Sequence, residues 1–188
     1  MHSYRSALIT FLFLVLTPSG LFAQTGSAGI GAYVGAGTIN GNSPSMTSFS
    51  ANIFLDYTPG FTHGTALRLG VLYARKIEVL LPSGLYDRYY PFVKGVSLKA
   101  VINQVFRDVV YTEEAIGPLL LNDRIFSDVN KLDVGLCFSF LAGLDLRDTD
   151  NTGFKSGIGI EYGLTFTNTS ASYFSIHLQG QYYFLPSY

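Results

Sequence analysis

Apolar residues alternate with small or polar residues along most of this chain of 188 residues. A period of two is typical of β-strands whose two faces differ chemically. Turn-forming sequences rich in Gly, Pro, Asn, Asp and Ser separate the alternating segments, and we expect one such turn at Asn122-Asp123. The pattern predicts eight strands, over residues 29–37, 48–57, 67–74, 92–102, 108–121, 132–146, 157–166 and 174–184.

The length of the predicted strands favours a barrel that spans a membrane. They run for about 8–15 residues, whereas strands of soluble proteins average about 5–6. A strand that crosses a bilayer needs about 9–11 residues. The segment 108–121 is the least regular, because Pro118 cannot donate a ladder hydrogen bond and the adjacent Glu113 and Glu114 must point to opposite faces.

The second face of the strands distinguishes a membrane barrel from a soluble one. A soluble barrel such as a lipocalin buries its apolar face and presents a charge-rich face to water. Here the second face is mainly Gly, Ser and Asn, and only 13% of all residues are charged, against about 25% in a typical soluble domain. We therefore predict an all-β protein, an eight-stranded antiparallel up-and-down transmembrane β-barrel. The alternative is a secreted soluble barrel that binds an apolar ligand.

The first 23 residues have the three parts of a secretory signal peptide. Arg5 gives a weakly positive start, an apolar run follows over residues 7–16, and Ala23 offers a small residue for cleavage. The apolar run is too short for a transmembrane helix. We predict a signal peptide over residues 1–23 and a barrel domain over residues 24–188.

The last predicted strand ends in Tyr182-Tyr183-Phe184, close to the end of the sequence. Alternating apolar residues with a late aromatic residue resemble the terminal strand of bacterial outer-membrane proteins. With the signal segment and the eight strands, the chain resembles the small outer-membrane β-barrel proteins of the OmpA/OmpX-like or PorT-like class. The resemblance implies the outer membrane of a Gram-negative bacterium, with both ends of the barrel domain in the periplasm.

That class also implies partners and a kind of function. The expected partners are membrane lipid and lipopolysaccharide, the outer-membrane barrel-assembly machinery, and a protein that docks through the loops. Eight strands leave room only for packed side chains, so no channel of useful width is expected. We predict a structural or partner-docking role.

Charged and polar side chains on the small-residue face are expected inside the barrel. Isolated charges would be unfavourable there, so they should pair. The expected polar network of the lumen consists of Asp56, Arg68, Lys99, Asp133, Glu161 and His177. Aromatic residues near strand ends are expected at the two membrane interfaces, namely Tyr57, Tyr73, Phe166, Tyr182 and Phe184.

A catalytic alternative rests on Glu161, Ser175 and His177, which share the inner face. A serine, a histidine and a carboxylate can together transfer an acyl group. The lipid A 3-O-deacylases, which are also small barrels, use such a trio, but there the histidine precedes the serine and the site faces lipid. We therefore predict that the protein is not an enzyme, with a lipid-modifying acyl hydrolase as the alternative.

Other chemistry finds little support in the composition. The formal net charge is −1 and no basic stripe occurs, so no nucleic-acid partner is expected. Cys137 is the one cysteine, which excludes an intramolecular disulfide and a multi-cysteine zinc site. The three histidines are scattered. We expect neither a metal nor a cofactor.

Overall fold

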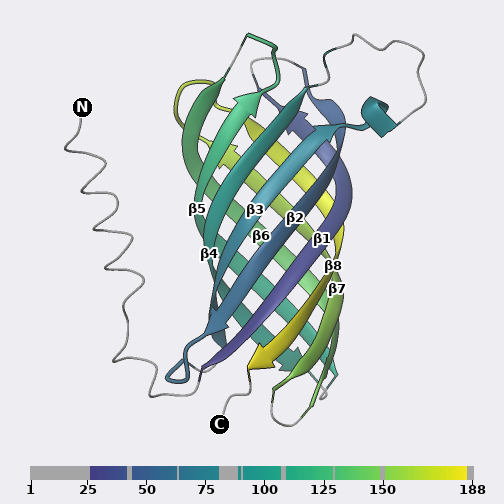
Figure 1. Ribbon diagram of the computed structural model, residues 1–188, viewed down its shortest axis with the longest axis vertical. Helices are drawn as coiled ribbons and strands as arrows, with labels where there is room; N and C mark the ends of the chain where they lie inside the picture. The colour runs from purple at the N-terminus through teal and green to yellow at the C-terminus, as the bar shows by residue number, and fades with distance from the viewer. Residues whose placement is uncertain are drawn as a thin grey trace, which may run out of the picture.

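The chain folds into a closed barrel of eight antiparallel strands in the computed structural model (Figure 1). The structure describes residues 26–41, 44–62, 64–80, 89, 91–106, 109–128, 130–148 and 151–185. The predicted signal peptide, residues 1–23, lies outside the described residues. None of the described helical residues forms a helix long and apolar enough to cross a bilayer.

The strands are 12 to 17 residues long. Each strand pairs with its neighbours in sequence, and β1 also pairs with β8. A short 3-10 helix, η1 (Ile77–Leu80), follows β3. The strands are β1 (Ser27–Asn40), β2 (Met46–Thr58), β3 (Thr65–Lys76), β4 (Phe92–Phe106), β5 (Val110–Arg124), β6 (Lys131–Arg147), β7 (Gly153–Thr165) and β8 (Ser172–Leu185).

The predicted all-β barrel of eight antiparallel strands is confirmed, including its irregular fifth strand. Pro118 faces outward, and the register between β4 and β5 is the same on both sides of it. The predicted turn at Asn122-Asp123 is wrong, because these residues pair with both β4 and β6. The chain turns only after Arg124, so β5 is longer than its sequence pattern indicates.

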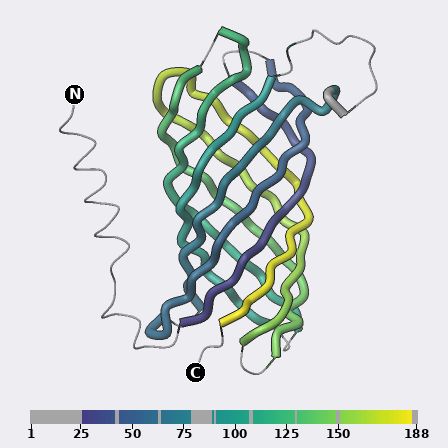
Figure 2. Tube along the Cα trace, viewed as in Figure 1, coloured from purple at the N-terminus to yellow at the C-terminus, as the bar shows by residue number. Residues whose placement is uncertain are grey.

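The connections between strands lie alternately at the two ends of the barrel (Figures 1 and 2). The start of β1, the end of β8 and the β2–β3, β4–β5 and β6–β7 connections share one end, which we call the terminal end. The other four connections form the loop end. The longest of these, residues 77–91, joins β3 to β4.

The outer face of the barrel is apolar and exposed. Val34, Ile53 and Ile158 are 63–64% exposed, while the residues between outward positions are mostly buried. A soluble barrel that binds an apolar ligand would bury its apolar face instead. The apolar face of the strands therefore points outward, as in a barrel that faces lipid.

The interior is divided into an apolar half and a polar half. The apolar half fills the loop end, and the polar half lies toward the terminal end. Large aromatic rings fit in the narrow lumen because small residues lie opposite them on the neighbouring strand. Tyr173 of β8, for example, lies opposite Gly163 of β7. The apolar plug consists of Tyr33, Ile39, Leu72, Ala74, Val93, Leu119, Leu121, Ile125, Cys137, Ala171 and Tyr173.

The five aromatic residues expected at the membrane interfaces lie toward the two ends of the strands. Tyr57, Tyr182 and Phe184 lie near the terminal end, and Tyr73 and Phe166 lie near the loop end. Phe166, Tyr182 and Phe184 are exposed, and Tyr57 and Tyr73 are half-buried. That these residues form two aromatic girdles at the membrane interfaces stays a prediction.

Gly163→Val should lower the heat resistance of the barrel. A Cβ atom at Gly163 would lie 2.2 Å from the ring of Tyr173, so the ring would have to move. Over-packing an interior typically destabilises a protein by about 1–3 kcal/mol. The temperature at which the folded gel band converts to the unfolded band measures this effect. Ala142→Val is the control, because Ala142 is exposed on the outer face. Equal conversion temperatures for both variants would contradict the prediction.

Candidate functional site: the polar network of the lumen

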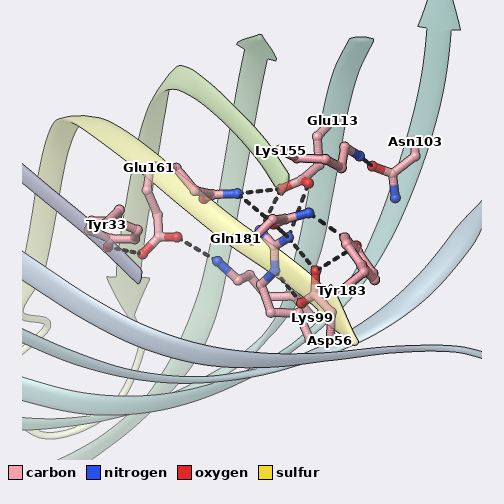
Figure 3. Close-up of polar contacts among 11 residues, drawn as sticks. Tyr33, Asp56, Lys99, Asn103, Glu113, Lys155, Glu161, Gln181 and Tyr183 are labelled. Atoms are coloured by element: carbon pink, nitrogen blue, oxygen red, sulfur yellow. Dashed lines mark hydrogen bonds and ion pairs between the residues drawn. The ribbon is translucent and has the colours of Figure 1, made fainter. Parts of the chain in front are cut away.

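Arg68 on β3 is the centre of the polar half of the lumen. Figure 3 labels several of the residues around it, among them Asp56 and Glu113. Its Nε and Nη2 donate to the two carboxylate oxygens of Asp56, at 2.6 and 2.7 Å. Its Nη1 and Nη2 also donate to Glu113, the second contact at 3.0 Å. The ring of Phe54 lies 4.0 Å from the guanidinium. All three charged side chains are almost fully buried. The positive charge of one arginine therefore offsets much of the negative charge of two buried carboxylates.

Three residues of β8 complete the hydrogen bonding around this centre. Gln181 accepts from Arg68 at 3.0 Å and donates to the Tyr183 hydroxyl at 3.0 Å. Tyr183 then donates to Asp56 at 3.2 Å. Gln179 donates to Gln181 at 3.1 Å. The strand that closes the barrel therefore also supplies the amides and hydroxyl that satisfy the central ions.

A second buried ion pair joins the polar network to the apolar plug. Lys99 on β4 donates to Glu161 on β7 at 2.5 Å. The hydroxyls of Tyr33 and Tyr173 donate to the other oxygen of Glu161, each at 2.7 Å. Both rings belong to the apolar plug. These two tyrosines thus have an apolar ring in one half of the lumen and a hydroxyl in the other.

Further charges lie nearer the terminal end. Lys155 donates to Asn103 at 2.9 Å and lies 3.7 Å from the centre of the Tyr111 ring. Asp145 and Arg147 form an ion pair at 2.7 Å. Among the described residues of this half of the lumen, four cations balance four carboxylates: Arg68, Lys99, Arg147 and Lys155 with Asp56, Glu113, Asp145 and Glu161.

The structure places the six predicted lumen residues inside the barrel, but it does not join all six in one network. Asp56, Arg68, Lys99 and Glu161 form the ion pairs described above. His177 stacks on Tyr33, with 4.0 Å between the ring centres. Among the described residues, its Nδ1 has no hydrogen-bond partner.

Asp133 lies apart from the ion pairs, at the loop end. It accepts hydrogen bonds from the hydroxyls of Thr167 and Thr169, at 3.1 and 2.5 Å. The Thr167 hydroxyl in turn accepts from the backbone N–H of Val134. Asp133 therefore holds the β7–β8 turn against the start of β6.

The three candidate catalytic residues have separate partners. The Ser175 hydroxyl lies 2.6 Å from the Ser50 hydroxyl, and Glu161 is engaged by Lys99 and two tyrosines. Ser175 is fully buried in the lumen. No hydrogen bond between the described atoms links Ser175 to His177. This arrangement is unlike a serine–histidine–carboxylate relay.

No group of three or more His, Cys, Asp or Glu side chains in the described part of the chain could hold a metal ion. The carboxylates of the lumen already accept from Arg68, Lys99, Tyr33, Tyr173 and Tyr183. Their arrangement provides charge balance rather than an open coordination site.

Several members of the network were not among the predicted site residues. Glu113 has an inner-face position that the strand alternation alone could have identified. Lys155 lies just outside the predicted seventh strand, and the tyrosines resemble the aromatic residues of an interface. Their inward direction becomes evident only from the register. The additional members are Tyr33, Asn103, Glu113, Asp145, Arg147, Lys155, Tyr173, Gln179, Gln181 and Tyr183.

No family model matches the sequence, and no curated protein sequence matches it. Solved structures do match. Neisserial surface protein A (NspA) has a TM-score of 0.64 at 9% identity, covering 86% of this chain and 100% of that chain. Ail, the attachment invasion locus protein of Yersinia pestis, was solved in complex with the heparin analogue sucrose octasulfate. It has a TM-score of 0.54 at 12% identity, with coverages of 86% and 100%.

The fold is that of a small bacterial outer-membrane β-barrel. A second structure of Ail matches with a TM-score of 0.51 at 12% identity, over 86% of this chain and 99% of that chain. The predicted resemblance to this class is confirmed at the level of fold. The exposed apolar outer face is that of a barrel that faces lipid.

Arg68→Met should destabilise the barrel strongly. The substitution leaves Asp56 and Glu113 buried without their shared cation, and removing one partner of a buried ion pair typically costs about 3–5 kcal/mol. Urea unfolding in a fixed detergent or lipid measures the free energy. The triple variant Asp56→Asn, Arg68→Met, Glu113→Gln should recover part of the loss, because it removes the uncompensated charges.

Lys76→Met is the matched control, since it breaks the Lys76–Glu78 ion pair in a partly exposed position. Surface pairs contribute about 0–1 kcal/mol. An Arg68→Met variant as stable as this control would contradict a stabilising role for the lumen network.

Proposed function

We propose that this protein is a non-enzymatic outer-membrane barrel that acts as a rigid scaffold and presents its loop end to a docking partner. The observation that carries the proposal is the filled lumen. Arg68, Lys99 and the apolar plug occupy the interior from one end toward the other. Eight-stranded barrels of this kind have interiors just wide enough for side chains. A role outside the lumen is therefore favoured over conduction.

The loop end is the surface best suited to docking. It carries four connections, including the longest, residues 77–91. Part of this surface is held in place by the lumen, because Asp133 binds Thr167 and Thr169 in the β7–β8 turn. The likeness to Ail, which was solved with a heparin analogue, supports an outward-facing loop end that meets a partner. A fixed turn on a rigid barrel lowers the entropy lost on docking.

The remaining partners follow from the membrane barrel itself. Membrane lipid and lipopolysaccharide would contact the apolar outer face, which includes Ile53 and Leu178. The barrel-assembly machinery would act on β8, whose outward residues end in Tyr182 and Phe184. In this proposal the signal peptide over residues 1–23 directs export.

The purified barrel should produce no stepwise conductance in a planar bilayer. Tyr33 and Tyr173 close the lumen where the plug meets the polar network, so ions have no continuous aqueous path. Single-channel recording at high salt tests this prediction. The variant Tyr33→Ala, Tyr173→Ala thins the plug and provides a comparison once its gel mobility shows that it folds. Discrete conductance steps from the unaltered protein would exclude the scaffold proposal in favour of a pore.

Substituting the candidate catalytic residues should leave membrane lipids unchanged. Ser175→Ala and His177→Ala remove the nucleophile and base that an acyl hydrolase would need. Mass spectrometry of lipids from cells that produce the unaltered protein, either variant or no protein would then give one acyl pattern. Loss of an acyl chain that requires both Ser175 and His177 would establish the acyl-hydrolase alternative instead.

A further inference from the structure

Three basic residues lie on the outer face of three adjacent strands at the loop end. Arg75 is on β3, Lys94 on β4 and Arg124 on β5. Each continues the outward positions of its strand, as Val71 and Tyr73 precede Arg75. Lys94 is exposed, and the two arginines are half-buried.

The strand register brings these residues together. Arg75 and Arg124 both lie directly opposite Phe92 of β4, one on each side. Two strand spacings separate the arginine Cα atoms by about 10 Å, and Lys94 lies about 7 Å along β4 from Phe92. Three long cationic side chains therefore surround one aromatic residue. They can converge on a single anionic group.

Aromatic residues place this basic cluster at the height of a membrane interface. The rings of Phe49, Tyr73 and Phe92 form an outward row. The ring centres of Phe49 and Tyr73 are 6.2 Å apart, and those of Tyr73 and Phe92 are 5.7 Å apart. The Arg124 guanidinium lies 5.9 Å from the centre of the Phe92 ring. Interfacial aromatic residues mark the depth of the lipid headgroups. The cations thus lie where headgroup phosphates are found.

Two of the three cations, Lys94 and Arg124, form no ion pair with a carboxylate in the described part of the chain. Glu78, by contrast, pairs with Lys76. Arg124 also has a buried Nε with no hydrogen-bond partner among the described residues. On the outward positions of the strands the one acidic residue is Glu114, which lies toward the terminal end.

Resting on the proposed function as an outer-membrane barrel, we propose that Arg75, Lys94 and Arg124 form a binding site for the phosphate groups of a lipid headgroup in the leaflet around the loop end. Guanidinium groups bind phosphate through paired hydrogen bonds, and the lysine ammonium adds a third positive charge. The row of rings packs against the upper acyl chains and the carbohydrate or glycerol region of the same lipid. The site anchors the barrel at a fixed depth and orders a shell of anionic lipid beside the docking surface.

Lipid A, a glycolipid that carries two phosphates, is the probe for this site. The full barrel is folded in neutral detergent, and native mass spectrometry follows binding during titration. Each interfacial cation contributes about fivefold to binding of an anionic lipid. Lys94→Gln with Arg124→Gln should therefore weaken binding by about 25-fold, and adding Arg75→Gln should bring the loss to about 100-fold. The same glycolipid without phosphates should bind the unaltered barrel as weakly as lipid A binds the triple variant.

The matched control is Lys76→Gln with Lys131→Gln, which removes two positive charges at the same end from residues off the outward face. This control should keep lipid A affinity within about twofold, since Lys76 already pairs with Glu78 and neither lysine lies on the outward face that carries the proposed site. A heat-dependent gel shift establishes that every variant is folded. Equal losses in the control and the test variant would overturn the proposal, as would equal binding of the phosphate-free glycolipid.

Sucrose octasulfate as a soluble competitor distinguishes a lipid site from a general polyanion site. Displacement of lipid A at equal concentration would also overturn the lipid assignment.

Discussion

Backbone hydrogen bonding in lipid is the constraint on which the rest of this structure depends. Hydrocarbon offers no partner for an exposed N–H or C=O group, so every spanning strand must be paired on both sides. The pairing of β1 with β8, from Ala28 opposite Leu185 to Asn40 opposite Ser172, provides the last ladder and removes both free edges. Closure with eight strands fixes a narrow interior, which side chains must then fill.

The interior is filled in two chemically different ways that meet at two tyrosines. Tyr33 and Tyr173 pack their rings in the apolar plug and donate their hydroxyls to Glu161. Toward the terminal end, Arg68 shares its guanidinium between Asp56 and Glu113. Buried charges are tolerated there because each carboxylate accepts several hydrogen bonds as well as an opposite charge. The result is a solid core inside a membrane barrel.

A filled interior directs the chemistry of this protein to its outer surface and its loop end. The apolar belt meets acyl chains, and the aromatic row of Phe49, Tyr73 and Phe92 marks an interface. Arg124 and Lys94 add positive charge at that height, on strands whose inner faces are fixed by the plug. Lipid anchoring and docking would thus share one rigid support.

The sequence by itself determined the barrel, its outer face and, to within about two residues, most of its strand limits, because a two-residue period is a local property of the chain. It also identified Arg68 and Glu161 as inner-face charges. Only the tertiary structure decided which charges meet, since Arg68 and Glu113 are 45 residues apart in sequence and Tyr33 and Glu161 are 128 apart. The alternation also could not predict which inward residues form the apolar plug and which form the polar half. Inward residues of both kinds occupy the same alternate positions along the strands. Barrel closure and strand register determine those contacts, and both arise from pairing between distant segments.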